Sequence, residues 1–212
     1  MRLPRCGSDS RPPVTANLLP LAVFVFVGLF SPGPNVLLLT ASGVRFGFPA
    51  TVPHLLGVPV GTGIVAALSA TGIGALLVAA PQLKVALQVI SSLWILWLAW
   101  RMVQSARIPR AADRGRPFTF LEAIAFQAVN PKMWAVTLAA AAGFSGGLSP
   151  GSEVLRLFTV FACINLFVCF FWVTVGHFLA PLLRADRAWR LFMTLMAGLM
   201  AASVILDFPV KS

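Results

Sequence analysis

The segment Ser31-Pro32-Gly33-Pro34-Asn35 decides how this chain can fold. It lies within residues 14–44, a run without a charged residue, where a membrane-spanning helix should be unbroken. Two prolines cannot continue an α-helix, because each lacks an N–H and clashes with the preceding turn, and the glycine adds backbone freedom. In hydrocarbon the freed backbone groups need partners, so such a break must be buried in protein or lie beside water. We therefore interpret the segment either as a structural kink or as part of a binding site.

The composition indicates a membrane protein. Of 212 residues, 58% are hydrophobic and 10% are charged, whereas roughly a quarter are charged in a soluble domain. Several uncharged stretches, such as those between residues 45 and 84 and between 156 and 184, exceed the roughly 20 residues that cross a bilayer as a helix. The net charge of +10 comes from arginines at the ends of apolar runs, which indicates membrane topology rather than nucleic-acid binding. We predict a multi-pass protein of the plasma (inner) membrane, in contact with the lipid bilayer and without a nucleic-acid partner.

The apolar runs predict an all-α fold with six transmembrane helices, the first and fourth interrupted. The spans are expected at about 17–44, 50–79, 84–104, 118–142, 154–180 and 189–207, with a kink at Pro59. Residues 1–16 are predicted to be a disordered basic N-terminal tail, and residues 17–207 the six-span domain. Its first repeat covers about 17–104, a cytoplasmic linker about 105–117, and the second repeat about 118–207. Nine lysines and arginines lie in the loops after spans 1, 3 and 5 and six on the other side, which places the former in the cytoplasm.

A second irregularity, Asn130-Pro131-Lys132, lies in the fourth span. The fourth span is the first span of the second half of the chain, and the first break lies in the first span of the first half. Three spans per half, an odd number, give the two halves opposite orientations in the membrane. Interrupted helices at matching positions of two halves are the best sequence indicator of a transporter binding site. In each motif a proline can begin a new half-helix, Pro34 after Gly33 and Pro131 after Asn130 as N-cap. The half-helices would then direct free N–H groups and positive dipole ends at a carboxylate.

Lys132 is an unusual residue for an apolar span. A lysine at the bilayer centre costs about 2.5–3.5 kcal/mol on insertion scales, so we expect it to face a wet cavity or an anion. Alternatively, the span begins at Met133 and the lysine snorkels to the surface, because residues 133–152 are themselves long enough to cross.

At these residues the chain resembles the LysE/RhtB family of amino-acid exporters. The resemblance covers about residues 17–207, and the matching positions are Pro32-Gly33-Pro34, Asn130-Pro131-Lys132, Gln127, Gly43, Gly47, Gly57 and Gly61. The chain departs from the family at Ser91-Ser92-Leu93-Trp94, where a glycine and a Tyr-Leu pair are common, and at Glu122, where a glycine is common. These departures leave the substrate open.

The resemblance implies export of amino acids or close derivatives from the cytoplasm, by proton antiport with alternating access. It implies neither an enzyme nor a cofactor, and no catalytic or metal-binding residue is predicted. The expected substrate-binding residues are Pro32, Gly33, Pro34, Asn35, Gln127, Asn130, Pro131 and Lys132. Candidates for coupling are Glu122, which could instead lie at the interface, and Asn165, which could instead hydrogen-bond a neighbouring helix. For His54 and His177, near span ends, both an interfacial position and a proton relay stay open.

Two alternative functions stay open from the sequence, an exporter of another solute and an intramembrane protease. An exporter of a metal cation or another small solute on the same frame would need acidic groups in the spans, and only Glu122 is available. An intramembrane serine protease could use Ser145, since residues 143–147 fit G-x-S-x-G, with His177 as its partner. The surrounding GFSGGLSPG is typical of a turn, and a separation above about 10 Å would exclude the pair, because catalysis needs hydrogen-bond reach. The specific amino acid, and whether the unit is a monomer or a homodimer, stay undetermined.

Overall fold

The computed structural model describes residues 18–31, 33–72, 81–107 and 115–207. These residues form helices and no strand, in agreement with the all-α prediction. The helices are α1 (Leu18–Phe30), α2 (Pro34–Ala70), α4 (Pro81–Arg107), α5 (Phe120–Val129), α6 (Pro131–Gly143), α7 (Pro150–Leu179) and α8 (Asp186–Asp207). The predicted tail, residues 1–16, lies outside the described residues.

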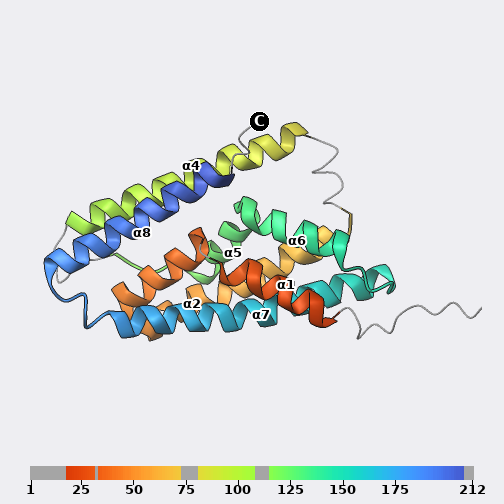
Figure 1. Cartoon of the computed structure of the whole chain (residues 1–212), viewed down its shortest axis with the longest axis horizontal. Helices are drawn as coiled ribbons and strands as arrows, with labels where there is room; N and C mark the ends of the chain where they lie inside the picture. Colours follow the sequence, from red (N-terminus) through yellow and green to blue (C-terminus); the bar gives the residue numbers. More distant parts are fainter. Residues whose placement is uncertain (1–17, 32, 73–80, 108–114, 208–212) are drawn as a thin grey trace, which may run out of the picture.

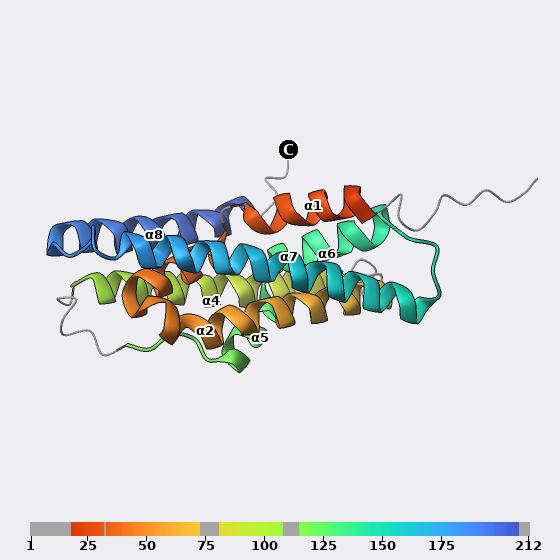
Figure 2. The same ribbon diagram turned by 90° about the horizontal axis from the view of Figure 1, so that it is seen from below.

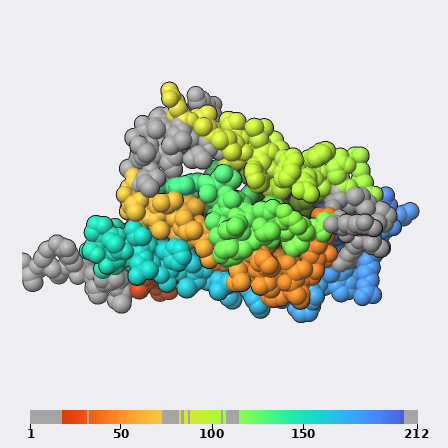
Figure 3. Space-filling model, turned by 180° about the vertical axis from the view of Figure 1, so that it is seen from behind, coloured from red at the N-terminus to blue at the C-terminus, as the bar shows by residue number. Residues whose placement is uncertain are grey.

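Two groups of helices lie side by side along the long axis of the molecule (Figures 1 and 2). The first group is built on α2, which packs along α7 and α5, with α1 and α6 beside them. The second is the antiparallel pair α4 and α8. On the opposite face, α4 forms a ridge along one edge of the molecule (Figure 3).

One apolar cluster joins the two groups. It contains Leu38 of α2, Phe126 of α5, Met102 of α4, and Trp189 and Met193 of α8. A second cluster lies between α1, the second half of α2, α6 and α7. The two clusters lie on opposite sides of the helix breaks, so the breaks are embedded between apolar packing layers.

Two of the described helices, α2 and α7, are long and apolar enough to cross a membrane, and α1 and α5 are shorter apolar helices. The expected first span corresponds to α1 with the start of α2, and the expected fourth span to α5 with α6. The expected turn between spans 1 and 2 falls at Gly47, which has φ 79° and ψ 171° within α2. Gly47 is the residue at which α2 leaves helical dihedral angles, and Pro59, where we expected a kink, lies further along within the helix. A positive φ is easily adopted by glycine, which explains the location of the bend.

Glycines set the closest helix contacts. A Cβ atom added at Gly57 of α2 would lie 2.3 Å from the Phe120 carbonyl oxygen of α5. One added at Gly176 of α7 would lie 2.3 Å from the carbonyl oxygen of Thr40 in α2. Small residues let helix backbones approach in this way, which is how helices associate tightly in a membrane. Helix α2 is thereby held against both α5 and α7.

Gly57→Ala should therefore destabilise the protein. The added methyl group meets backbone rather than a movable side chain, so we expect a cost of about 1–3 kcal/mol and a lower melting temperature in detergent. Gly198→Ala is the matched control, because Gly198 is an exposed residue of α8 with nothing within 4 Å of its added Cβ. The control should melt at the wild-type temperature or slightly above it; equal melting of the two variants would contradict the close contact.

Candidate functional site

The first helix break lies between Phe30 and Pro34. Gly33 is the extended N-cap of α2, with φ −171° and ψ 176°, and Pro34 begins the helix. Ser31 satisfies the end of α1, because its amide donates to the Val27 carbonyl (3.1 Å) and its hydroxyl to the Gly28 carbonyl (2.9 Å). The chain therefore leaves one helix and starts another within three residues. Pro32 lies outside the described residues.

At the second break, between α5 and α6, side chains hydrogen-bond the freed backbone groups. Asn130 is the N-cap of α6, and its side-chain oxygen accepts from the Lys132 amide at 3.1 Å. The carbonyls at the end of α5 also find donors: the Trp134 indole reaches the Ala128 carbonyl at 2.7 Å, and the Ser91 hydroxyl donates to the Val129 carbonyl. Ser91 is one of the positions at which the chain departs from the resemblance. The freed backbone groups are thus satisfied within the protein, as an apolar environment requires.

Lys132 brings the two breaks together. Its ammonium donates to the carbonyl oxygen and to the hydroxyl of Ser31, both at 2.8 Å. A Cβ added at Gly33 would lie 3.0 Å from the same nitrogen. The lysine therefore reaches the other break and does not extend along its span to the surface. We expected the charge of Lys132 at the starts of the half-helices. Its ammonium also lies at the C-terminal end of α1, where the helix dipole favours a cation.

Two buried amides complete the arrangement. The Gln127 side-chain NH₂ donates to the Asn35 side-chain oxygen at 3.2 Å, which links α5 to the start of α2. Gln127 and Asn130 are 0% and 1% exposed. Within the described part of the chain, Oε1 of Gln127 and Nδ2 of Asn130 have no hydrogen-bond partner. An unsatisfied buried polar atom costs about 1–3 kcal/mol, so one acceptor and one donor are left for a ligand or water at the breaks.

Comparison with known proteins identifies the family of this chain. Residues 26–207 match the family model of the LysE type translocators. The chain belongs to the LysE/RhtB family. A cysteine/O-acetylserine efflux protein of Escherichia coli (strain K12) is 28% identical over 167 residues, which cover 76% of this chain and 83% of that protein. One of Salmonella typhimurium (strain LT2) is 27% identical over 158 residues, 73% of this chain and 79% of its own length. No solved structure gives a significant match.

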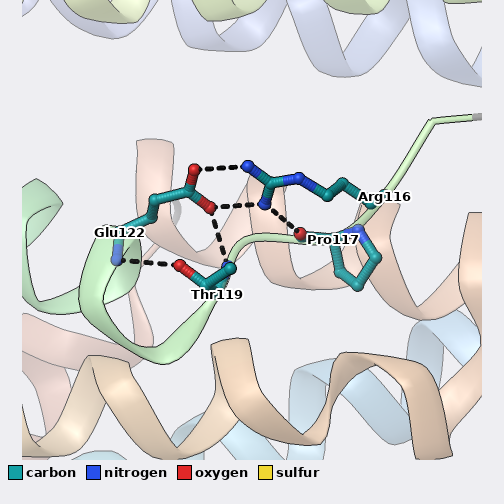
Figure 4. Close-up of polar contacts among 4 residues, drawn as sticks. All are labelled: Arg116, Pro117, Thr119 and Glu122. Carbon is teal, nitrogen blue, oxygen red and sulfur yellow. Dashed lines mark hydrogen bonds and ion pairs between the residues drawn. The ribbon is translucent and has the colours of Figure 1, made fainter.

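In this LysE-type translocator, Glu122 is part of a helix cap (Figure 4). Its carboxylate accepts two hydrogen bonds from Arg116, both at 2.7 Å, and one from the Thr119 amide at 2.8 Å. The Thr119 hydroxyl accepts from the Glu122 amide at 3.2 Å, which completes a capping box. The side chains of Arg116 and Glu122 are 65% and 40% exposed. Hydrogen bonding to Glu122 raises the pKa of the Arg116 guanidinium.

These contacts favour a structural role for Glu122. Several donors, one of them a guanidinium, stabilise the ionised carboxylate, which makes it a poor carrier of exchangeable protons. The T-x-x-E pattern of a capping box could have been read from residues 119–122 of the sequence. Its arginine partner could not, because the ion pair depends on how the loop before α5 turns.

The second coupling candidate, Asn165, links two helices. Its side-chain NH₂ donates to the Thr62 hydroxyl of α2 at 2.7 Å, and its oxygen accepts from the Cys169 thiol at 3.5 Å. Asn165 and Thr62 are both buried. The pair is the interhelical hydrogen bond that the sequence left open as an alternative to coupling.

The protease hypothesis does not fit the geometry. Ser145 lies in the connector between α6 and α7, and its hydroxyl accepts from the Gly147 amide at 3.4 Å. His177 lies in the last turn of α7, at the other end of a 30-residue helix (Figure 2). At 1.5 Å per residue, the rise from Pro150 to His177 is about 40 Å. The two side chains cannot form a catalytic pair.

A double-mutant cycle would separate structure from coupling at Asn165. Thr62→Val leaves the buried amide without its acceptor and should cost about 1–3 kcal/mol, measured as thermal stability in detergent. The double variant Thr62→Val with Asn165→Leu removes both partners and should lose less than the sum of the two single losses. Strictly additive losses would argue against the hydrogen bond. Loss of export by a stably folded double variant would instead assign Asn165 to coupling.

Proposed function

We propose that this protein exports a small amino acid, or a close derivative such as an O-acylated one, from the cytoplasm across the plasma membrane. The family is one of translocators, and relatives named for cysteine and O-acetylserine efflux align over most of both chains. The observation that carries the proposal is the meeting of the two helix breaks at the Lys132 ammonium. It gathers the start of a half-helix, a cation and buried amides in one place.

The groups at the breaks suit a zwitterion. The N-termini of α2 and α6 carry the positive ends of their dipoles, and Lys132 adds a full charge, so a substrate carboxylate is favoured there. Nδ2 of Asn130 is available to donate to that carboxylate, and Oε1 of Gln127 is available to accept from the substrate ammonium. The proposed binding residues are therefore those predicted from the sequence, with Ser31 added because it bonds Lys132.

The same charge disfavours the metal-cation alternative. A cation at the breaks would lie beside the Lys132 ammonium, and Glu122, the acidic side chain in the expected spans, is engaged by Arg116 in the cap of α5. Like charges in a low-dielectric surrounding repel strongly. An amino acid brings its own carboxylate and avoids this cost.

The packing supports two inverted repeats within residues 17–207. In two such repeats, span 1 corresponds to span 4 and span 2 corresponds to span 5. The close contact of span 1 with span 5, at Gly43 and Gly176, then becomes the contact of span 4 with span 2, at Gly57. Both contacts are present. We propose that the helices move so as to expose the breaks alternately to the two sides of the membrane, with proton antiport as the driving reaction.

Lys132→Met tests the proposed function. In cells or proteoliposomes loaded with labelled cysteine or O-acetylserine, we expect efflux to fall about tenfold or more, because a charge-assisted contact is worth about 1.5–3 kcal/mol. Lys132→Arg keeps the charge and should retain part of the activity. Arg190→Met, at an exposed position near the start of α8, is the control for loss of a positive charge and should export normally.

Protein amount in the membrane and melting temperature must be compared, because Lys132 also holds Ser31. Ser31→Ala removes one of the two acceptors of the ammonium while keeping its charge, and reports how much of any loss is structural. Wild-type efflux by Lys132→Met at equal expression would remove the lysine from the mechanism. Absence of efflux of any amino acid by the wild-type protein would overturn the proposed function itself.

A further inference from the structure

A cavity of about 350 Å³ lies between the α4–α8 pair and the starts of α2 and α5. Its volume falls within the range of small-molecule sites, about 300–1,000 Å³. The cavity is separate from the helix breaks, since none of the residues around Lys132 lines it. The polar and aromatic side chains that line it include His54, Arg45, Arg101, Arg116, Glu122 and Trp97.

His54 is the least expected member of this lining. Its side chain is 2% exposed, and neither ring nitrogen has a hydrogen-bond partner within the described residues. The ring packs against that of Phe118, with centroids 5.1 Å apart. Buried polar groups are nearly always hydrogen-bonded, and an unsatisfied one costs about 1–3 kcal/mol. A buried imidazole on a cavity wall therefore indicates a ligand that supplies the missing partner.

The charges in the wall define that ligand further. Three arginines face one carboxylate, so the cavity is positive overall. Arg116 and Glu122 form an ion pair with exposed side chains, and Arg101 lies over the Trp97 ring, 5.1 Å from its centroid. A positive cleft with apolar walls concentrates anions, and guanidinium groups bind carboxylates well. Glu122 is engaged by Arg116 in the α5 cap, so the net positive charge of the lining favours the carboxylate of a ligand.

An apolar barrier separates the cavity from the helix breaks. Glu122 in the cavity and Gln127 at the breaks lie on α5, five residues or about 7.5 Å apart along the axis. Phe126, next to Gln127 in the chain, is buried in the cluster that joins the two groups of helices, together with Leu38, which lines the cavity. Phe126 packs against Phe118, which in turn packs against His54.

We propose that this cavity is a second binding site, at which a small zwitterionic amino acid is held before it reaches the helix breaks. Guanidinium groups of the lining bind its carboxylate, and a ring nitrogen of His54 hydrogen-bonds it. The lining comes from the ends of helices that carry the basic loops, so the site faces the cytoplasm. The inference rests on the proposed function, because it assigns a waiting position to the same substrate.

The two histidines of the chain allow a direct test. Imidazole ¹⁵N signals of purified full-length protein in nanodiscs, labelled at histidine, are followed during titration with L-cysteine. The His54 signal should shift saturably, while the His177 signal, from a residue that does not line the cavity, should shift less and serves for comparison. His177→Gln assigns the two signals. Cysteamine, which lacks the carboxylate, should produce no saturable shift.

Variants separate this site from the one at the breaks. Arg101→Gln should weaken the His54 response about tenfold, in line with loss of a charge-assisted hydrogen bond, and Arg190→Gln should leave it unchanged. Lys132→Met should abolish export while the His54 response persists. A His54 signal that does not respond to cysteine overturns the second site, even where export depends on Lys132. A response to inorganic phosphate but not to cysteine would overturn the amino-acid assignment and leave an anion site.

Discussion

The contact between the Lys132 ammonium and Ser31 is the interaction on which the rest of the arrangement depends. A lysine in an apolar helical bundle is costly unless something compensates its charge. Here the compensation comes from the end of α1, where the Ser31 carbonyl accepts a hydrogen bond from the ammonium and the helix dipole is negative. The broken helix and the half-buried charge therefore stabilise each other.

The two breaks differ in how the helix that follows each of them is capped. The second supplies its own N-cap, since the Asn130 side chain bonds the Lys132 amide. The first has glycine as N-cap and therefore no capping side chain, and it depends on the lysine of the other half. Gly33 is suited to this position because a larger residue would crowd that ammonium. Both breaks are followed by a helix that begins with proline, but the single charge of Lys132 serves both, which brings the polar groups together at one point.

The helix breaks and the helical fold could be predicted from local sequence, because prolines and glycines affect the backbone at their own positions. The breaks at residues 31–35 and 130–132 and the helical composition follow from such local effects. The turn expected between the first two spans falls at Gly47, which is a further local effect, because glycine adopts a positive φ easily. The partners of Asn165 and Glu122 and the burial of His54 depend on packing between residues far apart in sequence, which no local pattern encodes.

The positions of the cavity and the breaks also suggest which parts move. The glycine contacts lock α2 against α5 and α7, so these helices behave as one body. The α4–α8 pair is joined to them through apolar side chains that include Phe126 and Leu38, the residues that separate the cavity from the breaks. Helices that pack through side chains can slide past each other by small shear movements, whereas the close backbone contacts at the glycines leave no room for this. We therefore propose displacement of the α4–α8 pair as the motion that would connect the two proposed sites while leaving the Lys132–Ser31 contact intact.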